Sequence, residues 1–502
     1  MKKHYLKLIL LLLIMSCSQD NPITEIEEEV INLAPNDFDI EIIDISHESA
    51  TINWNEATDP ENDSVSYNIY LNQTLVAEGI SELTYQFSDL SELTNYIGKV
   101  IANDANNNET SKTFSFTTEK YYLKYLKTYD FGEINFGIGY AAGSSYSMMK
   151  TNDENYIIAG KSQRPDGNAF RFFILKIDYN GNEIWKKFYD YQLYDSWNFK
   201  IIESATGFVL VGHHHVLNLD NDGNAIWHKK IDSYDIADGS AEIKSVALDL
   251  QGNIYLAGGR GSSDPEVPQE AVLTKLNNSG EIIWEKVFKS SFRSFFNDII
   301  INSSDQLIIL GSVETSGTTM EEYIQGPSSV EQIDFWVLKT NTDGEIIWQN
   351  TFGDGGYDFP SKIIFKSNGN YVFAGYSWGA YDISQGRIFE ISPEGNEEWN
   401  VFTGLTSTFS IAETLDNGFI ATGRIDIDSY NTNVGLYKFD NYGNEEWNQK
   451  YSEYATYLNG SGVIVENDGG FRISGSRNKY YFNDNDKPMI IIYKTDPSGD
   501  YE

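Results

Sequence analysis

The phrase Gly443-Asn-Glu-Glu-Trp447, a glycine with a tryptophan four residues later, recurs along this chain of 502 residues. Each copy follows a turn rich in acidic residues or asparagine. The other complete copies are Gly181-Asn-Glu-Ile-Trp185, Gly223-Asn-Ala-Ile-Trp227, Gly280-Glu-Ile-Ile-Trp284, Gly344-Glu-Ile-Ile-Trp348 and Gly395-Asn-Glu-Glu-Trp399, and a seventh begins at Gly499. Self-similarity at this spacing is typical of solenoids, arrays and propellers.

One block shows what a repeat contains. Apolar runs at 409–414 and 419–423 flank the turn Asp416-Asn-Gly418. The alternating run 434–440 suits a third strand with one buried face, and a hairpin loop leads to a fourth strand at 446–451. No block shows helical periodicity. Four-stranded repeats of roughly 50 residues predict the blades of a β-propeller. The tryptophans are expected to pack blade against blade, since a ligand site would not need six copies.

The segment ahead of the first block predicts how the ring closes. The last block shows three strands and no fourth, whereas Tyr125-Leu-Lys-Thr-Tyr129 matches Trp348-Gln-Asn-Thr-Phe352. Tyr125 takes the tryptophan position. This N-terminal strand is therefore expected to complete the last blade and leave no open sheet edge, which gives seven blades. The pattern resembles the quinoprotein-like propeller family, whose repeats carry a similar Gly-x-x-x-Trp phrase.

The first 17 residues predict a membrane anchor. Lysines precede a short apolar run at 8–15, and Ser16 and Cys17, the only cysteine, follow it. The run is too short to span a bilayer, so residues 1–17 are interpreted as a signal peptide. The small residue before a lone cysteine resembles the bacterial lipobox, although Met15 is unusual there. That resemblance implies that Cys17 carries the lipid, because several acyl chains anchor stably. An ordinary secreted protein is the alternative.

Two further segments precede the propeller. Residues 18–35 are acidic and are interpreted as a solvated tether; acids close behind the cysteine resemble surface-export signals of Bacteroidota lipoproteins. Residues 36–119 contain a strand with Trp54 and a pattern around Tyr96 that resembles a fibronectin type III domain with its tyrosine corner. Glu92 replaces a frequent proline. The predicted fold is all-β, a fibronectin type III sandwich followed by a seven-bladed β-propeller over 120–502.

Net charge and the pattern of candidate metal ligands limit which partners and cofactors are expected. The formal net charge of −38 repels phosphate backbones, so nucleic acid is not expected as a partner. Asp59, Glu61 and Asp63 lie on one turn and are candidate calcium ligands, with a solvated turn as the alternative. Three consecutive histidines, 213–215, point to alternating faces, so at most two converge on a metal. No other cofactor is expected, because quinone-binding propellers typically carry paired cysteines and more blades.

The loops predict where a ligand binds. Long insertions all fall in connections that share one face of a propeller, whereas the opposite face holds tight Asp/Asn-Gly turns. Aromatic residues beside carboxylates gather on the insertion-bearing face, and rings stack on sugars and bury well at interfaces. Packing between loops is the alternative reading for any one ring. The candidate ligand-binding residues are Tyr194, Trp197, Tyr357, Trp378, Tyr381 and Tyr457.

These features favour a lipid-anchored, surface-exposed binding or scaffold protein of the bacterial outer membrane. The propeller loop face would engage a glycan or a protein partner. The alternative is a glycan-active hydrolase or lyase with carboxylates at the channel mouth. A close carboxylate pair would favour the enzyme, and dispersed aromatic residues would favour binding. No catalytic residues are assigned, since no nucleophile motif, histidine triad or phosphate loop is present.

Overall fold

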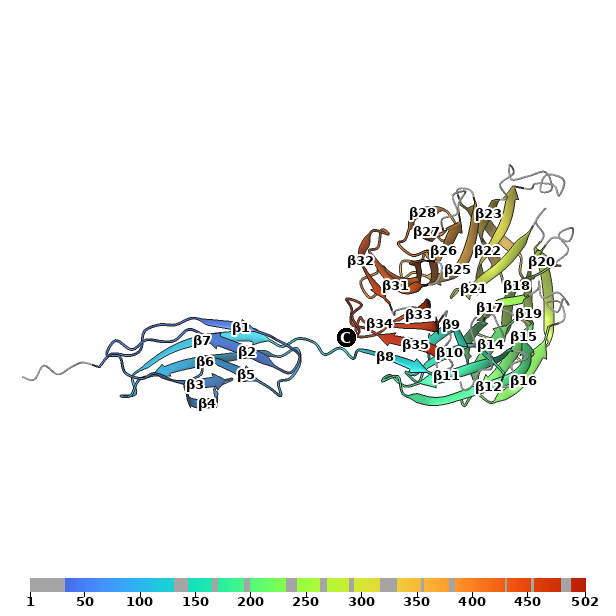
Figure 1. Cartoon of the computed structure of the whole chain (residues 1–502). Helices are drawn as coiled ribbons and strands as arrows, with labels where there is room; N and C mark the ends of the chain where they lie inside the picture. The colour runs from blue at the N-terminus through green and yellow to red at the C-terminus, as the bar shows by residue number, and fades with distance from the viewer. Residues whose placement is uncertain are drawn as a thin grey trace, which may run out of the picture. The chain divides into compact units, whose positions relative to one another are not determined.

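The computed structural model of the chain describes residues 32–130, 143–164, 170–193, 199–231, 242–261, 269–288, 293–316, 332–353, 356–378, 384–428, 431–452, 456–479 and 489–502. These residues form strands and turns (Figure 1), and among them there is no helix long and apolar enough to cross a membrane. The chain divides into two compact parts, Met1–Tyr121 and Tyr122–Glu502, called here the N-terminal and C-terminal parts. The predicted anchor at Cys17 lies outside the described residues.

The N-terminal part consists of two antiparallel sheets. One sheet has the order β1 (Ile40–Ile43), β2 (Ala50–Trp54), β5 (Thr84–Phe87), and the other has the order β4 (Thr74–Ile80), β3 (Ser66–Leu71), β6 (Asn95–Asn103), β7 (Glu109–Thr117). Alternate residues of β2 and β3 are buried, as in strands with one face on a core. Trp54 and Tyr67 meet edge to face at 5.4 Å between the sheets. The tryptophan predicted for this core is therefore buried in it.

Two tyrosine hydroxyls fix the loops of this sandwich. The Tyr96 hydroxyl accepts a hydrogen bond from the Ser91 backbone N–H at 2.8 Å. The Tyr67 hydroxyl accepts one from the Ala57 N–H, also at 2.8 Å. The first is the contact that a tyrosine corner requires.

The C-terminal part is a succession of four-stranded antiparallel modules. Module 1 is β9 (Gly143–Lys150), β10 (Tyr156–Gln163), β11 (Phe170–Ile177) and β12 (Glu183–Leu193); module 2 is β13 (Phe199–Ser204), β14 (Gly207–Gly212), β15 (His215–Asp220) and β16 (Ala225–Lys230); module 3 is β17 (Glu242–Leu248), β18 (Ile254–Arg260), β19 (Glu270–Leu276) and β20 (Ile282–Phe288). Module 4 is β21 (Ser294–Ile301), β22 (Gln306–Ser316), β23 (Gln332–Asn341) and β24 (Ile346–Phe352); module 5 is β25 (Tyr357–Phe365), β26 (Tyr371–Trp378), β27 (Ser384–Ile391) and β28 (Glu397–Phe402). Module 6 is β29 (Ser407–Glu413), β30 (Phe419–Asp426), β31 (Thr432–Phe439) and β32 (Glu445–Tyr451); module 7 is β33 (Thr456–Val465), β34 (Phe471–Lys479), β35 (Met489–Lys494) and β8 (Tyr125–Tyr129).

The modules stack face to face through apolar layers. One layer joins Ile308 and Phe335 of module 4 to Ile363 and Phe373 of module 5. The third strands are consequently covered on both sides. In β31, every residue except Asn433 is buried, so the expectation of one buried face was wrong. A module with a neighbour on each side buries both faces of its inner strands, and these faces are no longer in contact with water.

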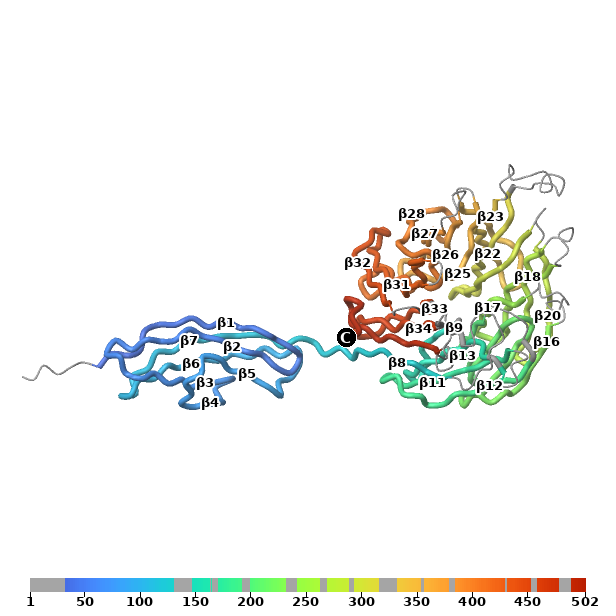
Figure 2. Tube along the Cα trace, viewed as in Figure 1, coloured from blue at the N-terminus to red at the C-terminus, as the bar shows by residue number. Residues whose placement is uncertain are grey.

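The first strands form the centre of the arrangement. Each first strand contacts the first strand of the next module, and β33 of module 7 contacts β9 of module 1. The Cα trace in Figure 2 shows β33 and β34 beside β9. Four-stranded modules stacked in this way make the C-terminal part an all-β propeller.

The repeated phrase joins each module to the one before it. Gly443 has a φ of 83°, and a Cβ added there would lie 2.8 Å from the Trp399 ring. Only glycine combines this left-handed conformation with such a close approach. The same contact pairs Gly223 with Trp185, Gly280 with Trp227, Gly344 with Trp284, Gly395 with Trp348, and Gly499 with Trp447. We call these positions the docking ring, and they confirm that the tryptophans pack between modules.

Strand β8 supplies the last docking contact. It pairs antiparallel with β35, and Tyr125 lies opposite Lys494 as Trp447 lies opposite Lys438 in module 6. A Cβ on Gly181 of module 1 would meet the Tyr125 hydroxyl at 2.6 Å. Tyr125 therefore takes the tryptophan position, as the sequence predicted.

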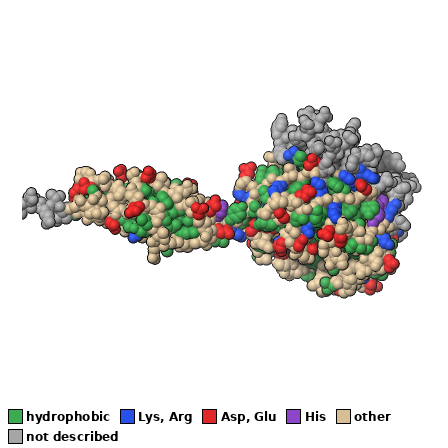
Figure 3. All heavy atoms as spheres, turned by 90° about the horizontal axis from the view of Figure 1, so that it is seen from below, with side chains coloured by type: hydrophobic (Ala, Val, Ile, Leu, Met, Phe, Trp, Pro, Cys, Tyr) green, Lys and Arg blue, Asp and Glu red, His purple; other side chains and the backbone are tan. Residues whose placement is uncertain are grey.

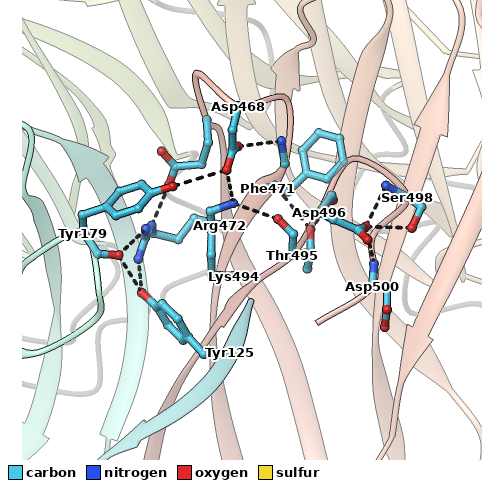
Figure 4. A network of polar contacts seen from close by, with 12 residues as sticks. Tyr125, Tyr179, Asp468, Phe471, Arg472, Lys494, Thr495, Asp496, Ser498 and Asp500 are labelled. Carbon is cyan, nitrogen blue, oxygen red and sulfur yellow. Dashed lines mark hydrogen bonds and ion pairs between the residues drawn. The ribbon is translucent and has the colours of Figure 1, made fainter. Parts of the chain in front are cut away.

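Arg472 compensates for the missing indole at this seam (Figure 4). The Trp348 Nε1–H donates to the Pro393 carbonyl at 3.0 Å, two residues before its partner glycine. At the seam, the equivalent carbonyl of Tyr179 accepts from Arg472 Nη2 at 3.0 Å. The guanidinium also lies 3.7 Å from the Tyr156 ring centroid and donates to Glu466 at 2.7 Å, and both charged side chains are buried. Tyr156 donates to the same carboxylate at 2.7 Å.

Candidate functional site

The loop end of module 5 carries a pair of aromatic rings, of which one is exposed and the other half-buried. Tyr357 and Trp378 are cross-strand partners of β25 and β26, with ring centroids 6.1 Å apart and planes 40° apart. Trp378 is 43% exposed, and no other tryptophan among the described residues is exposed to this degree. The structure thus brings together two of the residues predicted to bind a ligand.

The pair continues inward as a stripe. Phe359 and Tyr376, two residues further along each strand, stack at 4.8 Å. Residues two apart on a strand share a face, so the four rings form one surface. Phe409 of module 6 closes its inner end against Tyr376 at 6.5 Å, and burial raises the pKa of the Tyr376 hydroxyl. We call the four rings of module 5 the aromatic stripe.

A pair of carboxylates lies on the side of β25 opposite the stripe, with Asp358 on β25 and Asp334 on β23 of module 4. Ile333 of β23 pairs in parallel with Tyr357, which places Asp334 and Asp358 on neighbouring strands. Asp334 Oδ1 and Asp358 Oδ2 both come within 2.5 Å of a Cβ built on Gly353, so they are no more than about 5 Å apart. Asp358 accepts from the Ser377 hydroxyl, and Asp334 accepts from Thr315 at 2.7 Å.

The stripe and the carboxylates do not share one surface. Successive residues of a strand point to opposite faces, so Tyr357 and Asp358 diverge. Ring contacts on one side and the bond from Ser377 to Asp358 on the other agree with this alternation. The stripe can stack on a ligand, while the carboxylates are directed towards module 4.

The other predicted aromatic residues are not brought into this pair. Tyr194, Trp197 and Tyr381 lie outside the described residues. The backbone of Tyr457 belongs to β33, where it pairs with Asn478 and with Thr432 of module 6. This is the backbone position that Tyr357 occupies in module 5.

The predicted calcium ligands do not converge. Asp59 Oδ1 accepts from the backbone N–H groups of Glu61 and Asp63, at 2.9 and 3.0 Å. The Glu61 carboxylate instead accepts from the Leu33 N–H at 3.2 Å. Among the described residues, no three His, Cys, Asp or Glu side chains form a group that could hold a metal. The calcium prediction is therefore corrected to a turn stabilised by its own aspartate.

The histidines form a buried aromatic cluster. His213, His214 and His215 are all buried, and His215 Nδ1 lies 2.8 Å from His228 Nε2. Tyr191 stacks on His228 at 3.7 Å. Burial lowers the pKa of His228, which favours a neutral ring. They too form no metal-holding group within the described ranges.

Sequence reasoning missed a second ring of residues, at the centre. In each first strand, one residue pairs with the position just before the repeated glycine of the second strand. In every module except module 2, a register shift precedes it, as at a β-bulge, which re-aims a side chain. These residues are Ser147, Lys200, Ser245, Asp298, Lys362, Ser410 and Gly462, and we call them the hub ring.

Aligning the repeats on their second-strand glycine would have found this ring. Its members lie thirteen residues before that glycine, as Ser410 does before Gly423, except in module 2, where Lys200 lies twelve before Gly212. Their chemistry varies, so no residue type marks them.

Surface charge is mixed where it is visible. Figure 3 shows Asp and Glu side chains scattered among Lys and Arg on the face of the C-terminal part that it presents.

Comparisons with known proteins give no family. No family model matches the chain, and no curated protein matches it. Among solved structures, the WD40 domain of Neurospora crassa Pan2 is 11% identical with a TM-score of 0.44, covering 70% of this chain and 90% of that chain. A Synechocystis apocarotenoid oxygenase is 12% identical at TM-score 0.40, covering 70% and 94%. A glucose dehydrogenase is 8% identical at 0.34, covering 59% and 95%. Likenesses this distant indicate no substrate or partner.

Proposed function

We propose that this chain is a surface-anchored binding protein of the bacterial outer membrane, whose aromatic stripe engages a glycan or a protein partner. In this proposal the Cys17 lipid holds the chain, the acidic tether extends it, and a fibronectin type III domain spaces the propeller. The single observation that carries the binding role is the exposed Trp378 ring in contact with the half-buried Tyr357. Such rings stack on the apolar faces of sugars and bury well at protein interfaces.

The proposed architecture is a propeller of seven blades closed by β8. Pairing of β8 with β35, the Gly181–Tyr125 contact and the apolar layer that joins Tyr129 to module 1 support closure. The two-sheet sandwich and the Tyr96–Ser91 hydrogen bond support the fibronectin type III assignment.

The binding role is tested on the chain from residue 18 onward, which lacks the lipid. The chain is screened on a glycan array, and Trp378→Ala and Tyr357→Ala are measured against each glycan it binds. Loss of an interface anchor worth about 2 kcal/mol weakens binding roughly 30-fold. Tyr442→Ala is the matched control, since Tyr442 is exposed in a turn at the opposite ends of the strands. Equal affinity in all variants would exclude the stripe as the site.

The anchor is tested separately. Cys17→Ala is expected to release the protein from membranes, because Cys17 is the only cysteine that can carry the acyl chains. Acyl labelling and membrane fractionation measure this. Unchanged labelling in the variant would contradict the anchor and leave the stripe untouched.

A second function, glycan hydrolysis, is favoured by one observation. Asp334 and Asp358 are within about 5 Å of each other, and retaining glycosidases place their two carboxyl groups about 5–5.5 Å apart. The stripe lies on the other face of the strands, so binding remains the first proposal. Release of new reducing ends from bound glycans, abolished in Asp334→Asn and Asp358→Asn, would establish the enzyme instead.

A further inference from the structure

The hub ring brings side chains of non-neighbouring modules into contact. Lys200 of module 2 reaches past module 3 to Asp298 of module 4, with Nζ 3.0 Å from Oδ1. A contact that skips a module requires both side chains to meet at the centre of the propeller. Lys362 of module 5 donates to the Ser410 hydroxyl of module 6 at 3.1 Å.

Hub oxygens also tie neighbouring modules together. Asp298 Oδ2 accepts from the Ile363 N–H at 3.1 Å, and Ser410 Oγ accepts from the Val463 N–H at 3.3 Å. In both cases the donor follows the hub residue of the next module. The hub is therefore a built arrangement with fixed groups.

The charges of the hub do not balance. Asp298 is buried and accepts from Lys200, from the Ser245 hydroxyl at 2.6 Å and from Ile363, so its carboxylate is well satisfied. Lys362 makes no ion pair with any described residue; its contact is the neutral Ser410. Burial and, to a smaller extent, Lys200 lower the pKa of Lys362 to about 8, while Asp298 acts in the opposite direction. Two lysines thus share one carboxylate, which leaves one positive charge in excess in a protein whose net charge is −38.

We infer that the hub binds a small oxyanion, a carboxylate or an inorganic phosphate, between Lys362 and Lys200. Each lysine ammonium has three N–H donors. Lys362 uses one on Ser410 and Lys200 uses one on Asp298, so both lysines keep donors for an anion. Two cations and nearby hydroxyls are the groups that hold phosphate and carboxylate oxygens. Lys362 lies on the same strand as Tyr357 and Phe359 but beyond the register shift of β25, so this site is further along the strand than the Tyr357–Trp378 pair.

Thermal unfolding of the full chain tests the site. Inorganic phosphate or acetate replaces chloride at constant ionic strength, and a ligand that binds only the folded state raises the unfolding temperature. The wild type and Lys450→Met are expected to gain stability equally, and Lys362→Met is expected to gain less. Lys450 is an exposed lysine of β32, so that variant removes the same charge elsewhere. An equal gain in all three proteins would be a general salt effect and would overturn the inference.

Calorimetric titration keeps the inference testable if Lys362→Met does not fold. The wild type is expected to bind phosphate or acetate at one saturable site, and binding of either anion supports the proposal. A response without saturation for both anions overturns it. Chloride that competes as strongly as phosphate would also overturn it, because the hub would then hold a halide.

Discussion

The docking ring and the hub ring both arise from the same repeat, yet they differ in how uniform they are. Six docking positions are tryptophan and the seventh is Tyr125, because each seam presents the same packing problem. The hub positions hold three residue types besides glycine at the same pairing position: serine, lysine and aspartate occur there without a fixed order. In a repeat protein, uniform positions report packing, whereas departures from the repeat locate individual chemistry.

Tyr125 and Arg472 show what a departure in the docking ring involves. A phenol cannot reproduce the indole N–H, so Arg472 supplies the donor to Tyr179, and Glu466 neutralises Arg472. At the positions equivalent to Arg472, modules 4 and 5 have Ile308 and Val372. One substitution in the ring thus brings in a buried ion pair.

Removing β8, the strand proposed to close the ring, is the largest perturbation of the docking ring. Deletion of 120–132 removes β8, exposes the edge of β35 and takes Tyr129 out of an apolar layer. Truncating a buried aromatic side chain costs about 3–5 kcal/mol, and here the sheet edge opens as well. We expect the C-terminal part to lose cooperative unfolding in scanning calorimetry. Deletion of the equally long segment 19–31 is the control, and similar melting of both proteins would refute closure by β8.

Breaking the seam ion pair is the next largest effect. Arg472→Met leaves Glu466 buried and uncompensated, which costs about 3–5 kcal/mol. Urea unfolding measures the loss. The double variant Arg472→Met with Glu466→Gln is expected to recover part of it, because no uncompensated charge remains. If the double variant is as unstable as the sum of the single changes, the two residues are not coupled.

The comparison of the rings also explains what the sequence could predict. Docking glycines and tryptophans carry a visible period, so the four-stranded repeat and the role of Tyr125 were predictable. The hub positions share no residue type, so only their spacing from the second-strand glycine could have located them, and the register shifts that accompany six of them leave no composition signal. The prediction of calcium ligands around Asp59 failed to anticipate that its carboxylate accepts hydrogen bonds from backbone N–H groups of its own turn. The burial of both faces of β31 could not be predicted from its alternating sequence, because the neighbouring modules cover the second face.

The smallest expected loss of stability is at Trp378, and this prediction separates the two kinds of tryptophan within the space of two modules. Trp348 belongs to the docking ring, packs against Gly395 and donates to Pro393, so Trp348→Ala is expected to cost about 3–5 kcal/mol. Trp378 lies at the loop end of β26, is 43% exposed and contacts Tyr357. Its removal is expected to cost under about 1 kcal/mol of stability.

Binding should show the opposite order. Trp378→Ala is expected to remove about 2 kcal/mol of affinity for a ligand of the aromatic stripe, whereas Trp348→Ala should leave the affinity of the folded fraction unchanged. Unfolding temperature and affinity are measured on both variants under the same conditions. Trp378, which departs from the repeat, would then contribute to function, and Trp348, at the repeated position, would contribute to stability. If Trp378→Ala unfolds the protein as severely as Trp348→Ala, Trp378 is a structural residue and the stripe loses its exposed anchor.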